Sequence, residues 1–129
     1  MPAIAAAAQF AQATAFFCPE FGLPESSQAI WSPLVTKVSD RCGIEPDAFT
    51  LAAYDALKVF ARVVEQDNTI LNRKNDLTSS FTTLSNAYTG ATGTISLNAS
   101  GDRANGSFNY WGITSDGGSY QWTFVGQSE

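Results

Sequence analysis

The chain has 129 residues, 44% of them hydrophobic and 15% charged, and twelve acidic against seven basic residues give it a net charge of −5. This length predicts one domain, and the composition excludes an intrinsically disordered chain. Because the basic residues are few and scattered and histidine is absent, we expect no nucleic-acid partner, and the composition argues against most hydrolytic chemistry and against a zinc site. Since the sequence shows no nucleophile–base pair, metal-ligand cluster or phosphate-binding loop, we also expect no catalytic residues, no metal site and no cofactor.

The N-terminal segment is rich in alanine, the residue with the highest helix propensity. It predicts a first helix from about Ala3 to Phe17, with Pro2 at a position that suits a helix start. The first basic residue is Lys37, so the segment lacks the positive end of a signal peptide, and we expect a helix of the mature protein. The sequence CPEFGLPESS that follows is typical of a connector, because proline and glycine interrupt it.

A second helix is predicted to begin after Ser27, a residue that caps helices well, and to run through Cys42. Gly43 then supplies the left-handed stop that commonly ends a helix. Pro33 lies inside this segment, so we expect the regular part of the helix to be Pro33–Arg41.

The third helix is the clearest pattern in the sequence. It opens at Pro46 and Asp47, and its apolar residues recur at helical spacing, which places them on one face. They are Phe49, Ala53, Ala56, Leu57, Phe60 and Val64. After the polar loop QDNTILNRKN, a fourth helix is predicted with Asn75 or Asp76 as its cap. Its apolar side consists of Leu77, Phe81, Leu84 and Tyr88.

From Gly90 onward the pattern changes to strands and turns. A short strand is predicted at Thr94–Leu97, and two further strands, Ser107–Thr114 and Tyr120–Val125, form an antiparallel hairpin around the turn SDGGS. We expect the aromatic side chains of this hairpin to be buried beneath the helices. An exposed aromatic face would instead suit the stacking of sugar rings or the docking of a partner strand.

The two cysteines, Cys18 and Cys42, are too far apart in sequence to be a C-x-x-C redox pair. Two interpretations stay open. They form a disulfide, which would place the protein outside the cytoplasm, or they are two buried free thiols.

The helices have more apolar surface than the strands can cover. A long buried parallel strand would read as a continuous run of Val, Ile and Leu, and this sequence contains none. Either the helices pack mainly on each other, or the chain is part of something larger.

Three motifs follow one another in a recognisable order. The first is PDAFTLAAYDALKVFARVV, which contains Tyr54-Asp55-Ala56; the second is G-x-T-G-T-I at Gly90 to Ile95; the third is a Gly-Asp-Arg turn that ends at Arg103 before an aromatic strand. In this order they resemble the C-terminal part of type I periplasmic solute-binding proteins, the receptors of the branched-chain amino-acid transporter group. The resemblance covers about Phe49 to Ile113, and more loosely residues 27–125.

This resemblance implies an α/β fold that is part of a bilobal protein, with helices followed by a short strand and an antiparallel β-hairpin. Residues 1–26 would end the second lobe and cross over, residues 27–103 would form the helical part of the first lobe, and residues 104–129 would return to the second lobe as terminal strands. It also implies a non-catalytic protein of the periplasm or the extracellular space. Such a protein captures amino acids or similar small solutes and passes them to the membrane permease of an ABC transporter.

Phe49 matches the position where members of this family often place an aromatic residue beside the ligand, and it is the candidate ligand-binding residue. The residues alone favour a different role for it, as the start of the apolar stripe of its helix. For Tyr54 and Asp55 we favour structural roles. The loop with which the family grips its ligand would lie in an N-terminal lobe missing from this chain.

The uncovered helix faces also allow a second hypothesis. The chain would then be a free-standing α+β interaction module that forms homo-oligomers, in which a second copy covers the helices by exchanging elements, as in a domain-swapped dimer.

Overall fold

The computed structural model describes residues 2–128, apart from the side chains of residues 2, 3, 74 and 75. The chain forms two compact units. One contains residues 1–21 together with 108–129, and the other contains residues 22–107. The lobe boundaries expected from the resemblance, at 26/27 and 103/104, stay a prediction.

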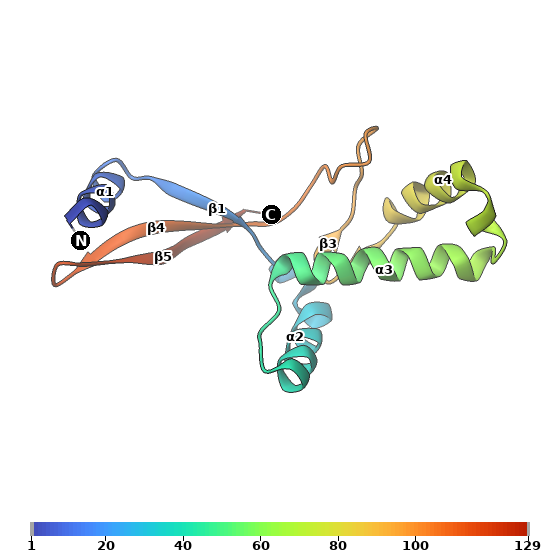
Figure 1. Cartoon of the computed structure of the whole chain (residues 1–129), viewed down its shortest axis with the longest axis horizontal. Coiled ribbons are helices and arrows are strands. Elements are labelled where there is room, and N and C mark those ends of the chain that lie inside the picture. Colours follow the sequence, from blue (N-terminus) through green and yellow to red (C-terminus); the bar gives the residue numbers. More distant parts are fainter. Residues whose placement is uncertain (1, 129) are drawn as a thin grey trace. The chain divides into compact units, whose positions relative to one another are not determined.

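The first unit is a three-stranded antiparallel sheet with one helix beside it (Figure 1). Its elements are α1 (Pro2–Ala13), β1 (Phe17–Phe21), β4 (Phe108–Asp116) and β5 (Ser119–Ser128), and the strand order is β1-β4-β5. Between β4 and β5 the chain reverses at Gly117 and Gly118, which have φ of 57° and 85°. Positive φ at both central residues matches the twist of a tight hairpin, so the predicted hairpin is confirmed.

The predicted first helix is too long, because the residues from Phe17 onward form strand β1. Helix α1 ends at Ala13 rather than Phe17, and Ala15 adopts a left-handed φ of 51° that turns the chain away. The segment from Phe17 is a strand, since Cys18 pairs with Trp111 and Phe21 with Phe108. The partner strand lies about ninety positions further along the sequence, so no local pattern revealed it.

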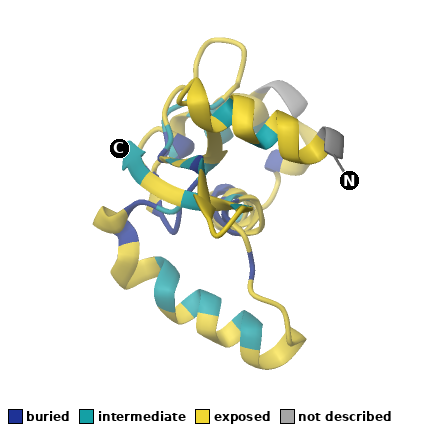
Figure 2. Cartoon of the chain, turned by 90° about the vertical axis from the view of Figure 1, so that its left-hand side faces the viewer, coloured by how far each residue is buried: buried dark blue, intermediate teal, exposed yellow. Residues whose placement is uncertain are grey.

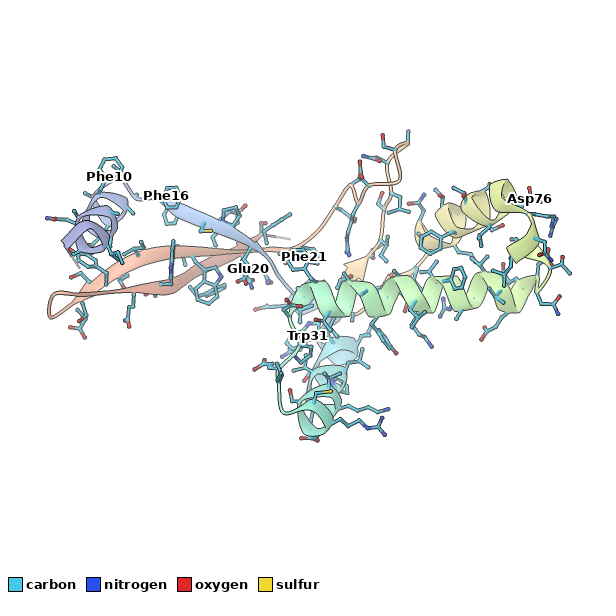
Figure 3. The ribbon with its side chains drawn as sticks, in the orientation of Figure 1. Phe10, Phe16, Glu20, Phe21, Trp31 and Asp76 are labelled. Carbon is cyan, nitrogen blue, oxygen red and sulfur yellow. The ribbon has the colours of Figure 1, made fainter. Side chains whose placement is uncertain are left out.

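The aromatic face of the hairpin is only partly covered. Trp111 and Phe124 pack edge to face with ring centroids 5.7 Å apart, and the indole Nε1 of Trp111 donates to Glu20 Oε2 at 2.7 Å. However, the side chains of Trp122 and Phe124 are 54% and 52% exposed. The expected burial is therefore wrong for these two residues and for Phe108 and Tyr110, which are also exposed, while Trp111 and Tyr120 are half-buried. Phe10, on the outer side of α1, is exposed as well (Figure 3).

The second unit contains three helices and a small two-stranded sheet. The helices are α2 (Gln28–Cys42), α3 (Ala48–Gln66) and α4 (Lys74–Ser85), and single 3-10 turns, η1 (Glu25–Ser27) and η2 (Ile70–Asn72), precede α2 and α4. Strands β2 (Thr89–Gly90) and β3 (Gly93–Thr94) pair in a tight turn. Helices α3 and α4 lie side by side (Figure 1). Their small core contains Val59, Tyr88 and Ile95, against which Phe81, Leu84 and Leu97 pack.

Several boundaries differ from the sequence prediction. Helix α2 begins at Gln28 directly after Ser27 and ends before Gly43, whose φ is 68°, both as predicted, but its regular part runs through Pro33 instead of beginning there. The predicted strand 94–97 is shorter, because side chains take its backbone donors. The backbone N–H of Ser96 donates to Asn105 Oδ1, and that of Leu97 donates to the side-chain oxygen of Asn86. Helix α4 begins at Lys74, ahead of both residues predicted to cap it.

Helix α3 has two apolar faces, and only one of them is covered. Its buried residues are Ala48, Leu51, Asp55, Val59 and Val63. At about 100° per residue, the predicted apolar stripe lies roughly 130° away from these, and Phe49, Leu57 and Phe60 on it are 66%, 65% and 39% exposed. A helix that is apolar over so much of its circumference is typical of one packed between two layers. Helix α2 is similarly open: it has no buried residue and appears only in teal and yellow in the lower part of Figure 2.

Cys18 lies on β1 in the first unit and Cys42 at the end of α2 in the second, and both residues are exposed. The alternative of two buried thiols is therefore wrong, while a disulfide between them stays a prediction. Among the described residues, no helix is long and apolar enough to cross a membrane.

Candidate functional site

The candidate ligand-binding residue, Phe49, lies in the first turn of α3 with its ring 66% exposed. Asp47 begins this helix: its Oδ1 accepts hydrogen bonds from the backbone N–H and the hydroxyl of Thr50, both at 2.7 Å. These bonds, first from the Thr50 hydroxyl and then from its N–H, hold the pKa of the Asp47 carboxyl below its ordinary value. The cap therefore fixes where α3 starts and presents Phe49 at its end.

Nearly two turns further along α3 from Phe49, Asp55 is completely buried. Its Oδ1 accepts a hydrogen bond from the backbone N–H of Ala91 at 2.9 Å. Its Oδ2 accepts one from the backbone N–H of Thr92 at 2.8 Å and one from the Thr92 hydroxyl at 2.7 Å. A buried carboxylate needs such partners, since an unpaired charge in the interior costs several kcal/mol. Asp55 thus ties α3 to the turn between β2 and β3.

Gly90 allows the Asp55 carboxylate to lie this close to the backbone of the turn between β2 and β3. A Cβ at this position would lie 2.2 Å from Asp55 Oδ1 and 2.5 Å from the ring of Tyr88. No side chain fits there without displacing the carboxylate. Burial and the nearby charge of Asp55 both raise the pKa of the Tyr88 hydroxyl above its ordinary value, and Arg62, which stacks 4.9 Å from the ring centroid, opposes them.

Arg103 completes the network from the other side of the turn. Its Nη1 donates to the Thr92 hydroxyl at 2.7 Å and its Nη2 to the Thr92 carbonyl at 2.6 Å, while its Nε donates to the carbonyl of Asn105 at 2.7 Å. Burial lowers the pKa of the Arg103 guanidinium, and the charge of Asp55 opposes that shift. The Thr92 hydroxyl accepts from Arg103 and donates to Asp55, so it connects the two charged groups.

This network holds the backbone of residues 91 and 92 in place. Its contacts join the charged side chains of Asp55 and Arg103 to backbone groups and to the Thr92 hydroxyl, which lies between them. Among the described residues, no group of three or more Cys, Asp or Glu side chains lies close enough to hold a metal ion. The structural role favoured for Asp55 is confirmed, although its partners Thr92 and Arg103 were not identified as a network. The sequence signal for this network was the pair of glycine-containing motifs that follow α3, at Gly90 to Ile95 and Gly101 to Arg103. They supply Gly90, Thr92 and Arg103.

Comparisons with known proteins identify the fold. No protein-family model matches the chain, and no curated protein matches it in sequence. Among solved structures, an ABC transporter substrate-binding protein from Desulfitobacterium hafniense superposes with a TM-score of 0.61 over 83% of this chain at 18% identity. The leucine-binding protein LivK from Thermotoga maritima superposes with a TM-score of 0.57 over the same share, also at 18% identity. The chain spans only 30% and 29% of the length of these two proteins. It therefore has part of a type I periplasmic-binding-protein fold.

Proposed function

We propose that this chain is the C-terminal part of a non-catalytic solute-binding protein that captures an amino acid or a similar small solute outside the cytoplasm for the permease of an ABC transporter. The observation that carries the proposal is the superposition of 83% of the chain on a substrate-binding protein and a leucine-binding protein. Two further features support it: the uncovered apolar face of α3, and the aromatic ring presented at the start of that helix.

In this proposal, the rest of the fold covers the open face of α3. Residues 27–103 belong to the first lobe, and residues 1–26 and 104–129 belong to the second. The face formed by Phe49, Ala53, Ala56, Leu57 and Phe60 packs on a sheet whose strands come from outside this chain. Burying it stabilises the protein by about 25 cal/mol per Å² of apolar area, which makes an uncovered face unfavourable.

Phe49 has a double role in this proposal. It begins the apolar stripe, and its exposed ring forms one wall of the cleft between the lobes, where it contacts the aliphatic part of the solute. Polar groups that grip the charged part of the solute come from the rest of the protein.

The test uses the protein at the length at which cells produce it, purified from its natural source and measured by mass spectrometry. We expect a chain roughly three times as long as this one, since this chain spans 30% of its structural neighbour. Isothermal titration calorimetry with leucine and a panel of other amino acids should then detect saturable binding. Phe49→Ala should weaken it about tenfold or more by removing apolar contact area, whereas Leu57→Ala, on the covered face, should lower stability instead. A folded protein of native length that binds none of these solutes would contradict the proposal.

The uncovered face also favours the second candidate, a homo-oligomeric interaction module in which another copy covers α3. Size-exclusion chromatography with light scattering separates the two. A native-length product no longer than this chain that forms a stable dimer would support the module and exclude the transport role.

A further inference from the structure

The sequence contains one Asn-Gly dipeptide, Asn105-Gly106, shortly after Arg103. Such a pair is chemically reactive, because asparagine is thermally labile and glycine places no Cβ beside its own backbone nitrogen. That nitrogen can therefore approach the side-chain carbonyl of the asparagine before it. Asn105 is exposed and Gly106 is half-buried, so water reaches the pair.

The reaction open to this pair is a deamidation, and it needs no reagent other than water. The backbone nitrogen of Gly106 attacks Cγ of Asn105, and a new C–N bond closes a succinimide ring. The side-chain nitrogen leaves as ammonia, which takes up the proton that the Gly106 nitrogen gives up. Water then opens the ring at either carbonyl. One opening leaves aspartate, and the other leaves isoaspartate, in which the main chain passes through the former side chain.

The fold holds the Asn105 amide away from this path at both of its polar atoms. Its Nδ2 donates to the carbonyl of Thr94 at 3.0 Å, and its Oδ1 accepts from the backbone N–H of Ser96 at 3.1 Å. Attack by Gly106 makes Cγ tetrahedral and removes Nδ2, so neither bond survives it. Ring closure therefore requires the amide to separate from residues 94 and 96.

Further contacts restrain the main chain at Asn105. The backbone N–H of the preceding residue, Ala104, donates to the carbonyl of Ser96 at 2.8 Å. The Nε of Arg103 donates to the carbonyl of Asn105 itself at 2.7 Å, while its two terminal nitrogens donate to Thr92. Opening a segment held in this way costs free energy, so the reactive arrangement is rare in the folded chain.

Neither product restores the contact that the amide makes with Thr94. An ionised aspartate accepts hydrogen bonds and donates none, so its carboxylate would face the carbonyl to which Asn105 now donates. In isoaspartate the main chain runs through the former side-chain carbonyl, which must then follow the chain to Gly106 instead. An opening that ends in reaction is therefore not reversed when the segment closes again.

We propose that Asn105-Gly106 is a site of spontaneous deamidation that the fold keeps closed. It reacts when the segment 103–105 separates from the segment 94–96, and conversion then prevents the two segments from closing as before. The contacts that carry this inference lie within the second unit, and it does not depend on the proposed function.

The test follows the conversion of Asn105 by mass spectrometry of proteolytic peptides, with chromatography that separates aspartate from isoaspartate. The full chain is kept at neutral pH, in buffer and in urea. We expect conversion to be at least about tenfold faster in urea, because both hydrogen bonds of the amide are then open. Gly106→Ala should slow conversion in urea about fivefold or more, since its Cβ crowds the attacking nitrogen.

Arg103→Met tests whether the fold controls the rate. In buffer it should accelerate conversion of Asn105 about fivefold or more, and by a larger factor than it raises the unfolded fraction measured by urea titration. In urea it should match the wild type. Arg73→Met is the matched control: it removes an arginine of the same unit that pairs with Asp67 and Asp76, and it should leave the rate in buffer unchanged. If Arg103→Met does not fold, Arg103→Lys takes its place, because lysine keeps the charge but lacks the forked donors.

Asn105→Asp reproduces one of the two products. It should lower the apparent melting temperature by about 3 °C or more, because a donor to Thr94 is replaced by a charged acceptor. Asn98→Asp is its control. Asn98 Oδ1 accepts from the backbone N–H groups of Ser100 and Asp102, both at 2.9 Å, and aspartate can accept both bonds equally well. This control should shift the melting temperature by less than about 1 °C.

Any one of the following results would overturn the proposal. Equal conversion in buffer and in urea would mean that the fold does not close the site, and no conversion in urea would mean that the pair is unreactive. A rate in Arg103→Met that matches Arg73→Met, or that rises only with the unfolded fraction, would mean that opening of this segment does not control the reaction. If Asn105→Asp were as stable as Asn98→Asp, conversion would leave the segments free to close.

Discussion

Asp55→Asn gives the most direct test of how the second unit is held together. The carboxylate accepts three hydrogen bonds, at 2.9, 2.8 and 2.7 Å, and is completely buried. An asparagine of the same shape can accept through its oxygen only, and its NH₂ group would face a backbone N–H. Hydrogen bonds to a buried charge are worth about 1.5–3 kcal/mol each, and a buried donor left without an acceptor costs about 1–3 kcal/mol. We therefore expect the free energy of unfolding to fall by about 3 kcal/mol.

The measurement is urea unfolding followed by circular dichroism, with wild type and variant compared at one pH. Asp76→Asn is the control, since that carboxylate is 55% exposed and accepts a hydrogen bond from Arg73 at 3.0 Å. A surface change of this kind should alter stability by no more than about 0.5 kcal/mol. The reasoning is refuted if Asp55→Asn is as mild as the control, because the network would then contribute no more than an exposed ion pair.

Three further predictions follow from other contacts. Gly90→Ala should cost about 1–3 kcal/mol in the same assay, because its Cβ would overlap Asp55 Oδ1; a neutral result would mean that the turn adjusts freely. The lowered pKa of Asp47 gives a contribution to stability that is present above the ordinary value of 3.8 and is lost as the pH falls through the lower folded value. Thr50→Val should therefore flatten the loss of stability in thermal melts between about pH 5 and about pH 2, and an unchanged profile would contradict this. Phe60→Lys should leave the melting temperature of this chain nearly unchanged, yet cost about 2 kcal/mol in the native-length protein, where we propose that the side chain is buried; equal effects in both would argue against a covered face.

The helices of the second unit follow local rules, and so they could be predicted. Asp47 caps α3 as expected, and Gly43 ends α2 in a left-handed conformation. These are interactions over a few residues, which the sequence displays directly. Strand β1 depends instead on pairing with β4, far away in sequence. Its sequence, FCPEF, contains a proline and no clear alternation, so the pattern placed Phe17 in the first helix and the residues from Cys18 in a connector.

The buried network of Asp55, Thr92 and Arg103 was visible in the sequence only as motifs, whereas Phe49, the ligand-binding candidate, stays a prediction. The motifs around Asp55, Gly90 and Arg103 were visible in their order along the chain. What they do was not visible, because hydrogen bonds that join position 55 to position 92, and position 92 to position 103, depend on how α3 and the turn pack together.

The amino-acid sequence by itself determined the local elements of this protein: where most helices begin and end, where the hairpin turns, and that α3 has more apolar surface than one partner requires. Spacing and capping act within one or two turns of chain, and they need no knowledge of the fold. Only the tertiary structure decided which side of α3 is buried: the predicted apolar stripe is uncovered in this chain, and the opposite side of the helix is the buried one. It also decided that the Asp55 carboxylate lies on that buried side, against a turn in which only glycine fits at position 90. Those outcomes depend on which surfaces meet, and contacts between distant segments leave no periodic trace in the sequence.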